Sequence, residues 1–378
     1  MTSRRTFLST AAACMASSGW PSMAAGLPAP TGKRPLIIDA LGAIENINLP
    51  IAVREDAASH FGIDARALAD AKASGLTAFN MTIGHVFGDG DAYEMTLSDV
   101  RAWNAFIRSS KDLILVRRAA DIRRAQADGR IGVILGFQNA AMMGSDAHRV
   151  AAFAKAGVRV IQLTYNGPNQ LGDGSMVPSN KGLTPFGHDV VAELNRSRVL
   201  VDLSHSGEQI CLDAAAASAS PIAITHTGCR AIADLPRNKT DRELRLVADK
   251  GGFVGIYFMP FLAVGRQPMA ADLIAHIEHA IDICGEDHVG IGTDGTVPRI
   301  DDMPGYMKGL EEEVRQRRAA GISAPGERPD IVPFLPDLTG PDKFRKLAGL
   351  LAKRGHTSGR IEKILGTNFL RVAGGVWS

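Results

Sequence analysis

LVDLSH at Leu200–His205 and PIAITH at Pro221–His226 are two short apolar runs, and each ends in a histidine. HVGIGTD at His288–Asp294 has the same form but ends in an aspartate. Short runs rich in Val and Ile are typical of buried parallel strands. The carboxyl ends of the strands in a parallel barrel meet at one mouth, so we expect His205, His226 and Asp294 to lie together there.

Runs of the same kind recur along the chain, separated by segments with helix caps and glycine stops. This alternation over 378 residues predicts an α/β protein with a single (β/α)8 TIM-barrel domain over residues 26–378. We expect two helices in Thr96–Gly129, one helix around Leu310–Ala320, and a C-terminal helical extension over Asp342–Val372 that closes the barrel. The five further strands are expected at Leu36–Leu41, Leu76–Ile83, Ile131–Phe137, Val158–Tyr165 and Phe253–Phe258.

The N-terminus is typical of an export signal. Residues 3–8, SRRTFL, resemble the twin-arginine motif of bacterial signals, and a mildly apolar stretch up to Ser18 and a small-residue site near residues 22–25 follow. The apolar stretch is too short to cross a bilayer. We therefore predict a signal peptide at residues 1–25, a mature protein that starts near Gly26 in the periplasm, and no membrane insertion.

The composition of the chain narrows the classes of partner that the protein is expected to bind. The 42 basic residues nearly balance the 40 acidic ones, the net charge is +2, and the chain has no basic tract. This balance argues against binding to nucleic acid or to an anionic membrane surface. Removal of the signal leaves Cys211, Cys229 and Cys284, which are compatible with one disulfide or with buried free thiols.

The three strand-end residues suit metal chemistry. Neutral imidazoles such as His205 and His226 are donors that Zn²⁺ prefers, and Asp294 could accept a proton from water or bind the metal itself. A single strand-end histidine is usually structural, but two histidines and one aspartate at matched strand ends favour a site. We expect one zinc ion, with Gln138 at another strand end as a weak further ligand.

Residues at two other places in the chain could bind a substrate. Arg237 and Asn238 follow the strand that ends at His226, and a guanidinium there could bind a substrate carboxylate through two hydrogen bonds. A surface ion pair is the alternative for Arg237. Tyr165, also at a strand end, could donate to a developing oxyanion or could be a buried structural tyrosine.

At these residues the chain resembles the membrane (renal) dipeptidase family, metallopeptidases with a (β/α)8 barrel and a binuclear zinc site. The resemblance covers nearly all of the mature chain. Its most specific parts are GLTPFG at 182–187, DLSH at 202–205, RN at 237–238, GIGTD at 290–294 and ILGTNFLR at 364–371.

The resemblance implies only part of the family's site. The family's His-x-Asp pair at the end of the first strand falls on Leu41 and Ala43, its bridging glutamate on Gln138, and a histidine that stabilises the tetrahedral intermediate on Tyr165. Leucine and alanine cannot bind zinc, and a neutral amide cannot replace a bridging carboxylate. The two histidines of the other zinc, the substrate-binding arginine and the site aspartate are kept as His205, His226, Arg237 and Asp294.

Two hypotheses follow. In the first, the chain is a zinc-dependent, dipeptidase-like hydrolase with a single metal ion at His205 and His226, which acts on a dipeptide or an N-acyl amino acid with a free carboxylate. In the second, the barrel is catalytically altered and binds a small carboxylated ligand, or catalyses a metal-free reaction. Members of the family often form dimers, and the sequence leaves a homodimer open.

Overall fold

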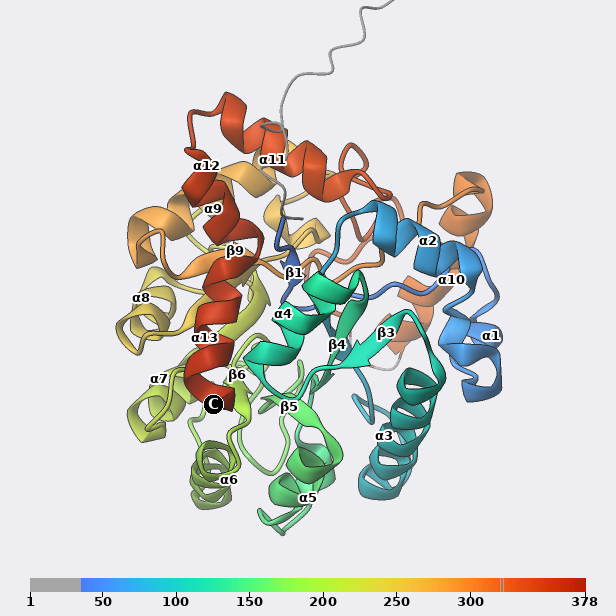
Figure 1. Ribbon diagram of the computed structural model, residues 1–378. Coiled ribbons are helices and arrows are strands. Elements are labelled where there is room, and N and C mark those ends of the chain that lie inside the picture. The colour runs from blue at the N-terminus through green and yellow to red at the C-terminus, as the bar shows by residue number, and fades with distance from the viewer. Residues whose placement is uncertain (1–34, 320, 322) are drawn as a thin grey trace, which may run out of the picture.

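Parallel strands form the wall of a nearly closed barrel in the computed structural model, which describes residues 35–319, 321 and 323–378 (Figure 1). The backbone N–H of Ala40 donates to the carbonyl of Ile291 at 3.0 Å and so links the last strand to the first. This arrangement confirms the predicted (β/α)8 class, while the predicted signal peptide lies outside the described residues. In barrel order, the strands are β1 (Ile38–Asp39), β2 (Ala78–Thr82), β4 (Ile131–Phe137), β5 (Val158–Gln162), β6 (Leu200–Asp202), β7 (Ala223–Thr227), β8 (Phe253–Ile256) and β9 (Val289–Ile291).

Helices surround this wall, and their starts follow from local sequence. The Thr184 hydroxyl accepts a hydrogen bond from the N–H of Gly187 with Pro185 in the first turn, and Thr240 and Glu243 form a capping box. The helices between strands are α1 (Ile51–Arg54), α2 (Ala65–Ala73), α3 (Ala92–Ser109), α4 (Ala119–Asp128), α5 (Arg149–Ala156), α6 (Pro185–Arg196), α7 (Glu208–Ala217), α8 (Asp241–Asp249) and α9 (Ala270–Cys284). Short 3₁₀ segments lie at Ala57–Gly62, which is kinked at residues 59–61, and at Ala141–Met143 and Pro260–Leu262.

The segment between α3 and α4 differs from the expectation of two helices alone. It contains a short strand, β3 (Leu113–Leu115), which pairs in parallel with β4 outside the barrel path, with Leu113 opposite Ile131. Leu113 is fully buried. Three apolar residues are too few to show a strand periodicity, so only the pairing with β4 makes this segment a strand.

The C-terminal helices close the barrel as predicted. They are α11 (Lys343–Lys353), α12 (Ser358–Glu362), a π-helical turn at Lys363–Thr367, and α13 (Asn368–Trp377). Phe369, Val372 and Trp377 of α13 pack in one buried cluster with strand residues such as Ile38 and Leu200. In Figure 1, α13 lies across the strands.

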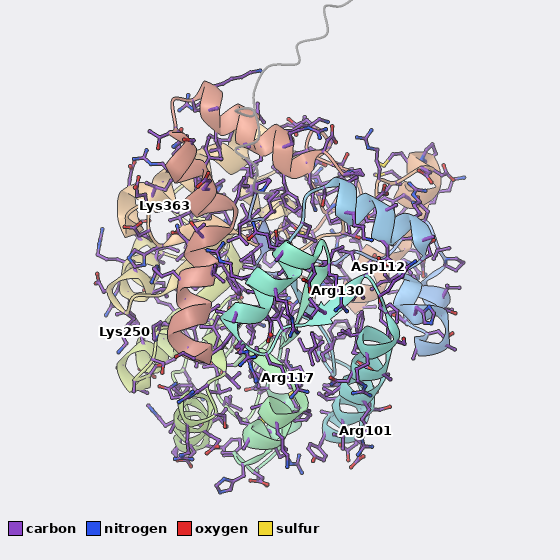
Figure 2. All side chains as sticks on the ribbon, in the orientation of Figure 1. Arg101, Asp112, Arg117, Arg130, Lys250 and Lys363 are labelled. Carbon is purple, nitrogen blue, oxygen red and sulfur yellow. The ribbon has the colours of Figure 1, made fainter. Side chains whose placement is uncertain are left out.

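The remaining observations concern surface and thiols. In Figure 2, Arg101 lies on α3 and Lys250 lies at the end of α8, both outside the strands. Cys211, Cys229 and Cys284 are buried free thiols, which settles the choice left open above. None of the described helices combines the length and apolar character that crossing a membrane requires.

Candidate metal and active site

The fold brings the two strand-end histidines together. His226 lies within β7 and His205 follows β6, and their Nε2 atoms are 3.0 Å apart. Their side chains are almost completely buried, with exposed fractions of 4% for His205 and 0% for His226. Adjacent parallel strands therefore place both imidazoles at one point, as the sequence predicts.

Hydrogen bonds fix the tautomer of each ring. The Nδ1 atom of His205 lies 2.7 Å from Oδ1 of Asn166, an acceptor, so Nδ1 carries a proton. The Nδ1 atom of His226 lies 2.9 Å from the hydroxyl of Thr225, whose own proton is donated to the Asp202 carboxylate at 2.6 Å. That hydroxyl must therefore accept the hydrogen bond from His226, whose Nδ1 carries the proton. Both rings then present unprotonated Nε2 atoms to each other.

Both rings are neutral at neutral pH. Burial, and after it the positive charge of Arg237, lower the pKa of His205 and of His226 well below 6.5. Two neutral nitrogens with facing lone pairs repel each other unless a cation or a proton donor lies between them. This donor pair fits one metal ion, although within the described ranges no group of three His, Cys, Asp or Glu side chains is arranged to hold a metal.

Arg237 and Asn238 both form hydrogen bonds within the protein. The Arg237 guanidinium, 2% exposed, donates to the carbonyl of Ser204 at 2.8 Å and lies 3.1 Å from Nε2 of His205. Asn238 donates to the carbonyls of Ala233 at 2.7 Å and Phe261 at 2.9 Å. The structure thus places Arg237 at Nε2 of His205, and Asn238 in the support of its loop.

Tyr165 covers the histidine pair. Its ring stacks on His205 with centroids 4.3 Å apart, and its hydroxyl is hydrogen-bonded to Arg317 of α10 (Met303–Ala319). Glu327 holds Arg317 by two hydrogen bonds of 2.9 and 3.0 Å. Sequence reasoning missed Arg317 because it lies in a long connection after β9 with no motif around it, and only the fold carries it to the mouth.

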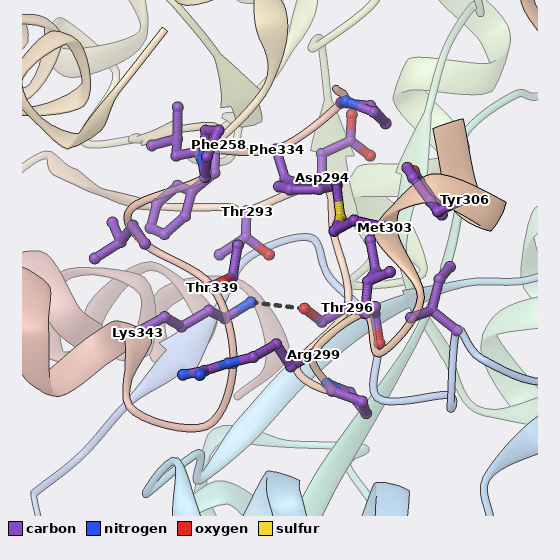
Figure 3. A pocket seen from close by; sticks show the side chains of 18 residues that line it. Phe258, Thr293, Asp294, Thr296, Arg299, Met303, Tyr306, Phe334, Thr339 and Lys343 are labelled. Atoms are coloured by element: carbon purple, nitrogen blue, oxygen red, sulfur yellow. Dashed lines mark hydrogen bonds between the residues drawn. The ribbon is translucent and has the colours of Figure 1, made fainter. Parts of the chain in front are cut away.

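Asp294 faces the open side of the site. Burial raises its pKa to about 7, and the charge of Asp39 acts in the same direction, while Arg237 and Arg317 oppose it. Asp294 lines a cavity of about 500 Å³ (Figure 3). It also lines a second cavity of about 190 Å³, together with Tyr165 and Arg317. A carboxyl group with this pKa can both accept and return a proton near neutral pH.

The end of β1 carries no metal ligand where the resemblance implies one. Leu41 is 3% exposed, and Ala43 pairs with Thr296. The nearby Asp39 carboxylate accepts hydrogen bonds from the N–H and the hydroxyl of Thr293 at 2.7 and 2.6 Å. Gln138 donates through its amide to the hydroxyl of Thr82 at 2.8 Å. The donors present at this mouth therefore fit one metal ion and do not fit the family's second.

The chain is similar in sequence to known proteins. The family model described as membrane dipeptidase (peptidase family M19) matches residues 42–319. An uncharacterized protein of the pqqA 5′ region of Klebsiella pneumoniae is 34% identical over 224 residues, 56% of this chain and 83% of that protein. The dipeptidase tcpJ of Claviceps purpurea is 27% identical over 263 residues, 68% of this chain and 54% of that protein, so the chain spans about half of its length.

A solved structure also resembles the whole described chain. The amidohydrolase from Pseudomonas aeruginosa is 30% identical, and the superposition has a TM-score of 0.73. The likeness covers 91% of this chain and 97% of that one.

Proposed function

Because this chain belongs to the membrane dipeptidase family, peptidase family M19, we propose that it hydrolyses the amide bond of a dipeptide or an N-acyl amino acid with a free carboxylate. Membership assigns the chain to the metallopeptidase hydrolases. The proposal adds a substrate class and a single Zn²⁺ ion held by His205 and His226.

The facing Nε2 atoms of His205 and His226 carry this proposal. Asn166 and Thr225 keep the protons on the far nitrogens, so that both lone pairs point into the same 3.0 Å gap. Such support of a ligand imidazole by a hydrogen-bond acceptor behind it is typical of metal sites. Bound zinc would supply Lewis acidity, which lowers the pKa of water and polarises a carbonyl.

The chain's own residues supply the proton transfers. Asp294, with a pKa of about 7, accepts the proton of the attacking water and returns it to the leaving amine. Arg317 donates to the oxygen of Tyr165, and burial raises the pKa of this phenol, so Tyr165 keeps its own proton. That O–H is then available to a developing oxyanion. Arg237 adds positive charge beside the same centre.

A second candidate function is the binding of a small carboxylated ligand without hydrolysis, or a metal-free reaction. The contact of Arg237 with Nε2 of His205 favours it, because the guanidinium uses the lone pair that a metal needs. In the described part of the chain, no carboxylate or thiol joins the two imidazoles in a group of three that could hold a metal, which points the same way, since a neutral donor pair binds zinc weakly.

Metal content and turnover measured on the same preparations separate these functions. We expect the wild-type protein to contain about one zinc ion per chain and to release amine from members of a panel of dipeptides and N-acetyl amino acids. Both the zinc and this activity should be lost in His205→Ala and in His226→Ala. Asp294→Asn should keep the zinc and lose turnover. His188→Ala, an exposed histidine outside the site, is the matched control. Turnover that survives in both site variants would overturn the hydrolase proposal.

The binding function makes the opposite prediction. A carboxylate ligand should then raise the thermal stability of the protein equally with and without a chelator, and no amide in the panel should be cleaved after zinc is supplied.

We also propose that the protein is exported to the periplasm by the twin-arginine-type signal at residues 1–25. The motif SRRTFL supports this location. Replacement of Arg4 and Arg5 by lysine should retain the protein in the cytoplasmic fraction of a bacterial host. Unchanged fractionation of this variant would refute the assignment.

A further inference from the structure

An open cavity lies at the opposite end of the barrel from the proposed active site. Arg130, Arg159 and Arg198 line it at the amino ends of β4, β5 and β6, whereas His205 and His226 lie toward carboxyl ends. The cavity measures about 720 Å³, which is in the range of small-molecule sites. The charged side chains of its lining are seven arginines and one aspartate: Arg108, Arg117, Arg118, Arg124, Arg130, Arg159, Arg198 and Asp121.

Both local sequence and the fold gather these arginines. Residues 117–130, RRAADIRRAQADGR, supply four of the seven, and Arg117 precedes α4 while Arg130 follows it (Figure 2). The others come from the end of α3, from β5 and from the connection between α6 and β6. Since the whole chain has 42 basic and 40 acidic residues, the excess of positive charge here is local.

The one aspartate of the lining does not neutralise this group. The Asp121 carboxylate lies 3.8 Å from the guanidinium of Arg118 and 3.6 Å from that of Arg124, and it also accepts two backbone N–H groups. Arg198 donates to a backbone oxygen of Ser378. Two arginines therefore share one carboxylate through long ion pairs, which contribute little at an exposed site.

The remaining arginines contact backbone carbonyls and not carboxylates. Arg159 donates to carbonyls at 2.5, 2.7 and 2.8 Å, and burial together with the charge of Arg117 lowers its pKa. Arg130 donates through Nη2 to the carbonyls of Ser110 and Leu113, but its buried Nε has no hydrogen-bond partner among the described residues. In the same part of the chain, no carboxylate side chain lies within 4.0 Å of Arg108, Arg117, Arg130 or Arg159.

We propose that this cavity binds a small soluble anion with two or more linked phosphate groups. Guanidinium groups recognise phosphate through paired hydrogen bonds, and each phosphate group offers several acceptor oxygens and more than one negative charge. Several guanidinium groups that lack a carboxylate call for a multivalent anion, because a single phosphate reaches only some of them. The site is separate from the histidine pair, so the assignment does not depend on the proposed hydrolase function.

Isothermal titration of the full-length protein with inorganic pyrophosphate, at constant ionic strength, tests this site. We expect saturable binding that is tighter for triphosphate and weaker for orthophosphate. The double variant Arg108→Gln/Arg117→Gln should weaken binding of pyrophosphate about tenfold or more, because it removes two charged hydrogen-bond donors. Both side chains are exposed, so the variant should fold, and thermal unfolding checks this.

The matched control removes the same charge from the same two helical regions. Arg101 on α3 and Arg123 on α4 are exposed arginines that do not line the cavity, so Arg101→Gln/Arg123→Gln should leave the affinity nearly unchanged. Extraction of a metal ion by pyrophosphate would not depend on Arg108 and Arg117, so the comparison separates it from binding.

Three results would overturn the proposal. The first is a wild-type protein that does not bind pyrophosphate, and the second is an equal loss of affinity in the two double variants, which would indicate a general effect of charge. The third concerns the source of the phosphate groups. Sedimentation with phosphatidylglycerol vesicles that requires Arg108 and Arg117, without binding of free pyrophosphate, would assign the cavity to a lipid headgroup instead of a soluble anion.

Discussion

The Nε2 atoms of His205 and His226 lie 3.0 Å apart, and the hydrogen bonds behind both rings leave neither nitrogen a proton to share. Arg237 offsets the repulsion between the two nitrogens only at His205, where its guanidinium contacts Nε2. Among the described residues, His226 Nε2 has no hydrogen-bond partner besides that other imidazole nitrogen. A cation between the two nitrogens would relieve this repulsion. The residues behind the two rings are therefore as informative about metal binding as the rings themselves.

Asn166 should control metal affinity from behind His205. Replacement by leucine removes the acceptor of the Nδ1 proton, so the ring loses its preference for the tautomer with a free Nε2. We expect Asn166→Leu to weaken zinc binding about 10- to 100-fold, as is typical for the loss of such support. Competition with a chromophoric chelator measures this affinity. His188→Ala is the control. An unchanged zinc affinity of Asn166→Leu would show that the tautomer of His205 does not affect metal binding.

Arg237 should oppose metal binding while it supports turnover. Its guanidinium uses the lone pair of His205 and adds a positive charge that a metal ion must displace or tolerate. Charged hydrogen bonds contribute about 1.5–3 kcal/mol, so Arg237→Met should bind zinc about tenfold more tightly or better. The same variant should lose amide hydrolysis. Chelator competition and amine release on one preparation test both, and weaker zinc binding would contradict the first expectation.

Arg317 should position Tyr165. Arg317→Met removes the donor to the phenol oxygen and also the ion pair with Glu327, whose carboxylate keeps the hydrogen bond from the Ser323 hydroxyl. We expect kcat to fall about tenfold, in line with the loss of one hydrogen bond of about 1.4 kcal/mol, with zinc content unchanged. Arg315→Met is the matched control, because Arg315 pairs with Glu312 on the exposed side of the same helix. Equal effects of the two substitutions would refute a specific role for Arg317.

Asp39 should make stability fall as pH rises. Burial raises its pKa from 3.8 to about 6, although the nearby charge of Lys343 and the hydrogen bonds from Thr293 lower it. The folded state therefore holds the proton more tightly than the unfolded state, and the resulting stabilisation is complete below about pH 3.8 and lost as the pH rises through about 6. The shift corresponds to roughly 3 kcal/mol.

Asp39→Asn should abolish that part of the pH dependence. Denaturant titrations of both proteins between pH 4 and pH 8 (about the range over which Asp39 titrates) measure it. The wild-type free energy of unfolding should decline relative to that of the variant as the pH rises. Parallel curves would mean that Asp39 titrates alike in the folded and unfolded states.

The sequence predicts the barrel well because each strand and helix carries local signals. Runs such as Leu200–His205 have strand composition, and helix starts such as Thr240 carry their own caps. It also predicts that His205 and His226 meet, because parallel strands end at one mouth. It does not predict β3, whose three apolar residues form a strand only by pairing with β4.

The chain by itself determined the fold class, the family and the pair of imidazoles, since these depend on residue types at short, regular spacings. Only the tertiary structure decided what surrounds that pair. Arg317 and Lys343 reach the mouth from the region after β9, and local sequence carries no signal of where a long connection folds back. Burial then changes the chemistry of the groups gathered there, since it depends on every neighbour at once. It lowers the pKa of both histidines and raises that of Asp294 to about 7.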